Sequence, residues 1–136
     1  MKMSTKARYG LYVAVQLAEK YEGGEMVRIP YLSEVTGVSE GYLEQIMALL
    51  RKEGIVESAR GAAGGYRLSA APGEISVGRV LRSVEGNLLF VDCLSDECKR
   101  SEVCVSHALW KGLYDVINGY LDSVSLEKLI QEGENE

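Results

Sequence analysis

Cysteine and histidine are scarce in this chain of 136 residues, which contains three cysteines and one histidine. An odd number of cysteines argues against a closed disulfide framework. A single histidine, with no nucleophile in a recognisable motif, leaves no catalytic constellation. We therefore do not expect an enzyme or a small-molecule substrate.

Long apolar segments are also missing. No apolar run approaches the roughly 20 residues that a membrane-spanning helix needs. The start, MKMSTKARYGLYVAV, lacks a long apolar stretch followed by a small-residue cleavage site. We expect neither a membrane segment nor a signal peptide, and we expect the protein in the cytoplasm. Apolar residues at 46% and charged residues at 26% are typical of a soluble globular protein.

Positive charge is in short supply overall, but it is unevenly distributed. Residues 1–67 carry nine Lys and Arg against eight Asp and Glu, a net charge of +1. Residues 68–136 carry six against twelve, a net charge of −6, which gives −5 for the whole chain. The first half can therefore present a local basic face, and the acidic total does not exclude nucleic acid as a partner.

The helices expected in the first half have the order of a helix-turn-helix protein. Helical spacing of apolar residues predicts a helix over 5–21, with Ser4 or Thr5 as its cap. Two short helices follow, over IPYLSEVT and over the stretch that begins after Ser39 and ends before Gly54. The three-residue joint between them predicts a helix-turn-helix.

Two short strands, IVESA and GYRLS, flank the glycine-rich RGAAG and predict a β-hairpin wing. A further helix begins after Ser76. The fold class is thus mainly α with a small β-hairpin wing. We expect a winged helix-turn-helix DNA-binding domain over residues 1–85, followed by an irregular loop over residues 86–107.

Residues 105–136 are predicted to form a long helix, to about Asp122, and a short final helix from Ser125. Few other elements remain to cover the apolar side of the long helix, which favours pairing with a second copy. A homodimer would match a palindromic double-stranded DNA site. The apolar residues of the long helix are Leu109, Trp110, Leu113, Val116, Ile117, Tyr120 and Leu121.

The second helix of the helix-turn-helix has the size of the DNA major groove. Its outward-facing residues are expected to be Glu40, Gly41, Glu44 and Gln45. Glutamine can pair with adenine through two hydrogen bonds, and glutamate can accept one from cytosine. The alternative for each of these residues is an ordinary solvated helix face.

Basic residues are expected to contact the DNA backbone from two other places. Arg60 lies at the wing tip beside a glycine, where it can enter the minor groove or bind a phosphate. Lys6 and Arg8 at the start of the first helix can bind phosphates, although positive charge there opposes the helix dipole.

All the cysteines and the histidine fall within CLSDECKRSEVCVSH, with the spacing C-x4-C-x5-C-x2-H. An iron–sulfur cluster or a tetrahedral zinc ion could be held by Cys93, Cys98, Cys104 and His107. The spacing alone favours neither of these two metal groups clearly. Three buried apolar cysteines, or a thiol redox sensor in which two cysteines pair, are the alternatives.

Several segments together resemble a known family. MSTKARYGLYVAVQLA, VSEGYLEQIMALLRKEGIVES, ARGAAGGYRLS, ISVGRVLRSVEG and CVSHALW are similar to the IscR-type iron–sulfur cluster regulators. These are winged-helix transcriptional regulators, and the family also includes NsrR and CymR. The similarity covers roughly residues 1–131.

The resemblance implies a 2Fe–2S cluster on Cys93, Cys98, Cys104 and His107, in preference to zinc. It implies that Tyr42, Glu44 and Gln45 meet DNA from the recognition helix and that Arg60 does so from the wing. Glu44 would influence the choice of site between the apo and cluster-bound forms.

Two positions depart from the family pattern. Four residues, LSDE, separate the first two cysteines, where the family usually has five. Gly41 stands where IscR-type helices carry a serine.

The sequence therefore predicts a DNA-binding repressor of Fe–S cluster assembly genes that senses iron–sulfur status. The alternatives are a nitric-oxide or thiol redox-sensing regulator on the same scaffold, or a zinc-stabilised module that binds nucleic acid or protein.

Overall fold

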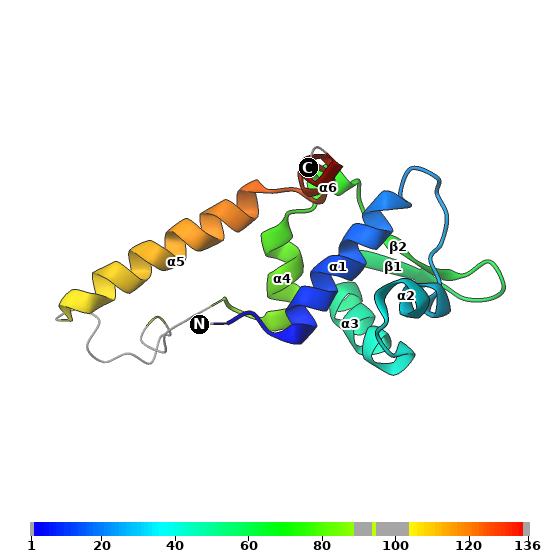
Figure 1. Ribbon diagram of the computed structural model, residues 1–136, viewed down its shortest axis with the longest axis horizontal. Helices are drawn as coiled ribbons and strands as arrows, with labels where there is room; N and C mark the ends of the chain where they lie inside the picture. Colours follow the sequence, from blue (N-terminus) through cyan, green and yellow to red (C-terminus); the bar gives the residue numbers. More distant parts are fainter. Residues whose placement is uncertain (1, 89–93, 95–103, 135–136) are drawn as a thin grey trace.

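The computed structural model describes residues 2–88, 94 and 104–134 and consists mainly of helices with one β-hairpin (Figure 1). The predicted fold class is confirmed. The elements are α1 (Thr5–Glu19), α2 (Ile29–Thr36), α3 (Glu40–Lys52), β1 (Val56–Ala59), β2 (Gly65–Leu68), the short 3-10 helix η1 (Pro72–Glu74), α4 (Val77–Glu85), α5 (Val105–Ser123) and α6 (Leu126–Glu134).

Serine side chains cap four of the helices, and at α6 the Ser125 hydroxyl accepts from the Lys128 backbone N–H at 3.0 Å. The hydroxyl groups of Ser4, Ser39 and Ser76 cap α1, α3 and α4, and each accepts a hydrogen bond from a backbone N–H in the first turn. These hydrogen bonds satisfy donors that have no partner within the helix. Helix α2 ends at Gly37, whose positive φ of 75° suits a glycine. The sharp turn before α3 thus follows from local sequence.

The core lies where α1 packs against α3, α4 and the hairpin. Helix α3 buries one face: Leu43, Ile46, Met47 and Leu50. Every described element from α1 to α4 except η1 contributes a buried apolar residue, whereas α5 contributes none. The core therefore holds α3 firmly and leaves α5 largely outside.

The hairpin is tied to the segment that precedes α2. Strands β1 and β2 pair antiparallel, with Val56 opposite Leu68. Val27 exchanges two backbone hydrogen bonds with Tyr66, at N···O distances of 2.7 and 2.8 Å. A Cβ at Gly65 would lie 2.6 Å from the Val27 carbonyl oxygen, so this close approach needs glycine. The segment before α2 therefore supports the hairpin through its backbone.

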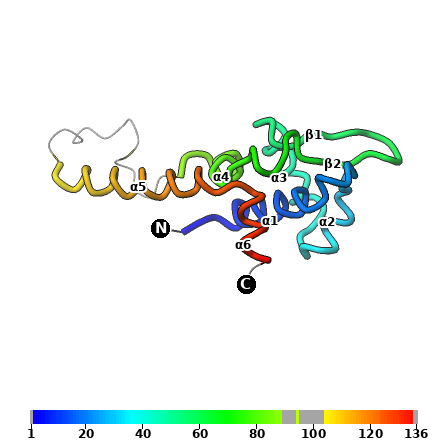
Figure 2. Tube along the Cα trace, turned by 90° about the horizontal axis from the view of Figure 1, so that it is seen from above, coloured from blue at the N-terminus to red at the C-terminus, as the bar shows by residue number. Residues whose placement is uncertain are grey.

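Helix α5 projects from the body as a long arm, and α6 returns to the body (Figures 1 and 2). The backbone N–H of Val77 donates to the carbonyl of Val124 at 2.8 Å, and that of Leu126 donates to Ile75 at 2.9 Å. Val124 and Leu126 are buried in the core, and α6 packs against α1 and η1. One core thus receives side chains from both ends of the chain.

No helix in the described part of the chain is both long enough and apolar enough to cross a membrane. Most of the predicted loop 86–107 lies outside the described residues, so the division at its ends stays a prediction.

Candidate functional site: a nucleic-acid interface and a ligand pair on α5

The solvent face of α3 carries free polar side chains. Glu44 and Gln45 are exposed, and neither makes a side-chain hydrogen bond or ion pair within the described residues. Gly41 is also exposed, and a Cβ built there would meet nothing within 4 Å. The packing of Leu43 and Ile46 on the opposite side fixes the direction of this face. It can therefore approach base edges without losing internal contacts.

The first turns of α1 and α3 lie side by side. The Lys6 ammonium is 6.0 Å from the centre of the Tyr42 ring. The Tyr42 and Tyr9 rings pack edge to face, with centroids 6.3 Å apart. Arg8 is exposed on α1. The structure thus brings Lys6 and Tyr42 together, and it places a basic helix end next to the recognition helix.

The wing tip presents Arg60 to solvent, and Arg60 has no partner among the described residues. The backbone around it is tightly folded, because a Cβ at Gly64 would collide with the Ala59 carbonyl. The Nη1 atom of Arg28, just before α2, donates to the Ala62 carbonyl at 2.5 Å. A second arginine thereby restrains the loop that carries Arg60.

A groove of about 420 Å³ separates the end of α3 from the hairpin. Arg51 and Lys52 line it, and Arg51 Nη1 also donates to the Ser58 hydroxyl at 3.2 Å. Both residues lie in the last turn of α3, and Glu44 of the same helix also lines the groove. A phosphate group fits such a pair of cations. The other lining residues are Met47, Ala48 and Tyr66.

Two of the four predicted cluster ligands lie on the described start of α5. Cys104 is exposed at the N-cap, and the His107 backbone N–H donates to its carbonyl at 3.2 Å. The Nδ1 atom of His107 is buried and has no hydrogen-bond partner among the described residues. Cys93 and Cys98 lie outside those residues. The described part alone holds no group of three possible metal ligands.

The chain is similar to known proteins over nearly its whole length. Residues 3–132 match the Rrf2 family, described as iron-dependent transcriptional regulators. The chain belongs to this family. Relatives include the HTH-type transcriptional regulator IscR of Aliivibrio salmonicida, which is 38% identical over 98% of this chain and 80% of its own length.

Two solved structures extend the likeness to the fold. T. potens IscR is 36% identical, with a TM-score of 0.81 over 99% of this chain and 90% of its own. CymR, the global cysteine regulator of B. subtilis, is 37% identical, with a TM-score of 0.80 over 97% and 98%. This Rrf2-family protein is thus a helix-turn-helix transcriptional regulator and not an enzyme, as its sequence predicted.

Proposed function

We propose that this protein is a homodimeric repressor of Fe–S cluster assembly genes. In this proposal it binds a palindromic DNA operator and senses iron–sulfur status through a 2Fe–2S cluster held by Cys93, Cys98, Cys104 and His107. Acting on bacterial DNA, it would work in the cytoplasm. The observation that supports the sensing part is the buried Nδ1 atom of His107, which has no hydrogen-bond partner in the part of the chain that the structure describes. This atom lies one helical turn from the exposed Cys104 thiol.

These residues suit the proposed cluster chemically. A buried imidazole nitrogen without a partner is costly unless something binds it. The Cys104 thiol is exposed at the N-cap of α5, so a metal group can reach it. A bound cluster would supply a group that is sensitive to oxidation and to iron supply.

DNA binding would use the surfaces already described. Glu44 and Gln45 would meet base edges, with Glu44 influencing the choice of site as the family resemblance implies. Tyr42 would join them from the same helix, and Arg60 would enter the minor groove or bind a phosphate. The flanking cations would bind phosphates: Lys6, Arg8, Arg51 and Lys52.

The dimer is supported by an apolar stripe on α5. The stripe consists of five exposed apolar residues. At about 100° per residue, these five residues lie within about 80° of one another around the helix axis. Asn118, the buried residue of α5, lies about 180° from the stripe's centre. A second copy would cover apolar surface that the monomer leaves in water. The exposed members are Val105, Leu109, Leu113, Val116 and Tyr120.

Overall likeness does not separate an IscR-type regulator from a CymR-type regulator, because identity to CymR is 37% and identity to T. potens IscR is 36%. His107 favours the cluster, since a sensor that acts only by pairing two thiols has no need of an imidazole. Zinc remains the chemical competitor because it accepts the same four ligands.

Anaerobic purification tests the sensing proposal. We expect a coloured protein with two iron and two sulfide per chain and little zinc. Cys93→Ser, Cys98→Ser, Cys104→Ser and His107→Ala should each lower the iron content, whereas Ser106→Ala on the same helix end should not. A colourless protein with stoichiometric zinc would refute the cluster. Full iron in the Cys93→Ser variant would remove Cys93 from the ligand set.

Binding to operator duplexes, selected from a random library, tests the DNA interface. Gln45→Ala should weaken binding to the selected site by about 5- to 150-fold, which corresponds to about 1–3 kcal/mol for a lost base contact. Arg60→Ala should reduce the slope of log affinity against log salt by about one. Gln131→Ala and Lys128→Ala on α6 are the matched controls. Equal affinities for all four variants would contradict the helix and wing assignments.

A further inference from the structure

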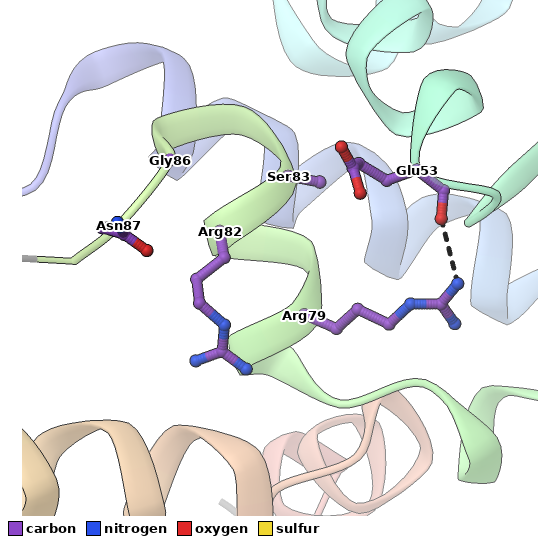
Figure 3. Close-up of a pocket in the computed structure, with 6 residues that line it drawn as sticks. All are labelled: Glu53, Arg79, Arg82, Ser83, Gly86 and Asn87. Atoms are coloured by element: carbon purple, nitrogen blue, oxygen red, sulfur yellow. Dashed lines mark hydrogen bonds between the residues drawn. The ribbon is translucent and has the colours of Figure 1, made fainter.

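Helix α4 lies between the recognition helix and the long arm, and two of its arginines reach in different directions (Figure 3). Arg79 and Arg82 are one helical turn apart and lie beside an open cavity of about 390 Å³. The sequence placed them simply on a capped helix. Their partners show that each connects α4 to another helix.

Arg79 reaches the end of the recognition helix. Its Nη2 atom donates to the carbonyl oxygen of Glu53 at 3.0 Å, and Glu53 is the C-cap of α3. Carbonyl groups at a helix C-terminus lack partners within the helix and carry partial negative charge. A guanidinium group from α4 therefore satisfies one of them and holds the end of α3 in place.

Arg82 reaches the long arm. Its Nη1 atom donates to Asn118 Oδ1 at 3.0 Å, and its Nη2 atom forms an ion pair with Asp122. Asn118 is buried and donates in turn to the Tyr114 carbonyl at 3.0 Å. Gly78 allows the close approach, since a Cβ there would collide with Asp122. The contact is thus specific in geometry as well as in charge.

The contact of Arg82 with Asn118 and Asp122 lies where it can control the direction of α5. Asn118 and Asp122 lie in the last turns of α5, near the backbone bridge between Ser76 and Ser125. The fourteen residues from Val105 to Asn118 span about 20 Å, so a tilt of 10° would move the far end by about 3 Å. No buried apolar residue of α5 opposes such a tilt.

We infer that Arg82, together with Arg79, sets the half-site spacing that the dimer accepts on DNA. We call these two residues the arginine bracket. The bracket fixes the direction of α5 relative to α3 through one rigid helix. In a dimer formed through α5, that direction determines how far apart the two recognition helices lie. The inference depends on the proposed function, because spacing has meaning only for a dimer on DNA.

The test measures affinity against half-site spacing with the full chain. Duplexes would carry the selected half-sites at the preferred spacing, at one or two base pairs more or fewer, and as a single half-site. We expect the wild type to lose about tenfold or more when one base pair is added, since this rotates a half-site by about 35°. In Arg82→Ala the loss should shrink to about two- to threefold.

Several controls separate positioning from general damage. Arg82→Lys keeps the ion pair but not the fork of donors, so its spacing profile should be intermediate. Lys128→Ala removes the same charge from α6 and should leave the profile unchanged. Arg82→Ala should bind the single half-site within about twofold of the wild type. A spacing profile in Arg82→Ala equal to that of the wild type would overturn the inference.

A second measurement needs no DNA. Trp110 is the single tryptophan and lies on α5, so a fluorotryptophan label gives one ¹⁹F resonance from the arm. Arg82→Ala should broaden or split this resonance, whereas Lys128→Ala should not. An unchanged resonance would count against the bracket. If the wild type selected no duplex, the proposed function would fail, while the ¹⁹F spectrum would still report on Arg82.

Discussion

At the scale of single residues, two glycines differ in the space that a side chain would find around them. Gly10 is buried on α1, and a Cβ there would lie 2.9 Å from Cγ2 of Val84 on α4. Valine in a helix has one strongly preferred rotamer, so it cannot easily turn away. Gly41 on α3 has nothing within 4 Å of the same position. Of these two glycines, only Gly10 is therefore required by packing.

Gly10→Ala should lower the free energy of unfolding even though alanine favours a helix. The gain in helix propensity is about 1 kcal/mol, whereas overpacking costs about 1–3 kcal/mol. We expect a net loss of about 1 kcal/mol in urea denaturation. Gly41→Ala is the matched control and should raise stability by up to about 1 kcal/mol. A stabilised Gly10→Ala protein would show that α4 can move away from α1.

Gly41 also bears on the interface with DNA. The open space around it means that a serine, as in IscR-type helices, fits without strain. The glycine at this position is therefore not required by the fold, and a difference in operator sequence is its expected consequence.

At the scale of elements, α5 differs from the other long helices because its exposed apolar residues face away from the body. The exposed fraction of the residue surface is 64% for Leu109 and 69% for Val116. Helix α3, in contrast, buries its apolar side and exposes its polar side. The apolar side of α3 thus packs into the core, whereas in our proposal the apolar side of α5 packs against a second copy of the chain.

Val116→Gln should dissociate the proposed dimer. Removing a buried valine costs about 1.5 kcal/mol, and a two-fold interface loses two of them. The sum of about 3 kcal/mol corresponds to a roughly hundredfold higher dissociation constant. Sedimentation velocity over a range of concentrations would measure it.

Lys111→Gln places the same residue on the opposite side of α5 and should leave the dissociation constant nearly unchanged, because its ion pair with Asp115 is exposed. If both variants had the same dissociation constant as the wild type, the apolar stripe would not form the dimer interface.

At the scale of the whole molecule, the chain closes on itself after the arm. Leu126, at the start of α6, is fully buried, although α5 separates it and Val124 in sequence from the other core residues. The winged-helix unit therefore includes a segment from the far end of the chain. This closure fixes the C-terminal end of α5 on the body and leaves its N-terminal end, with Cys104 and His107, at a distance (Figure 1).

Leu126→Ala should destabilise the entire DNA-binding unit. A fully buried Leu→Ala change costs about 2–5 kcal/mol through lost burial and the cavity left behind. We expect one cooperative thermal transition at a lower temperature, measured by circular dichroism. Leu129→Ala on the same helix is half-buried and should cost about half as much. Two separate transitions would show instead that α6 unfolds independently of the core.

Much of the fold could be predicted because its signals are local. Serine caps, the glycine after α2 and the apolar spacing of α3 act within a few residues, so they placed the helix-turn-helix and the hairpin correctly. The outward direction of Glu44 and Gln45 followed from the same periodicity. The cluster ligands were proposed from residue type and family resemblance, and that part of the site stays a prediction.

By itself the sequence determined the order of the α-helices and their limits to within about two residues, the hairpin and the polar face of α3, because caps, turns and periodicity are short-range effects. Only the tertiary structure decided that Arg79 and Arg82 connect α3 to α5, that Arg28 supports the wing and that α6 completes the core. Such contacts join residues far apart in the chain, and their partners are selected by packing in three dimensions, which no local pattern encodes.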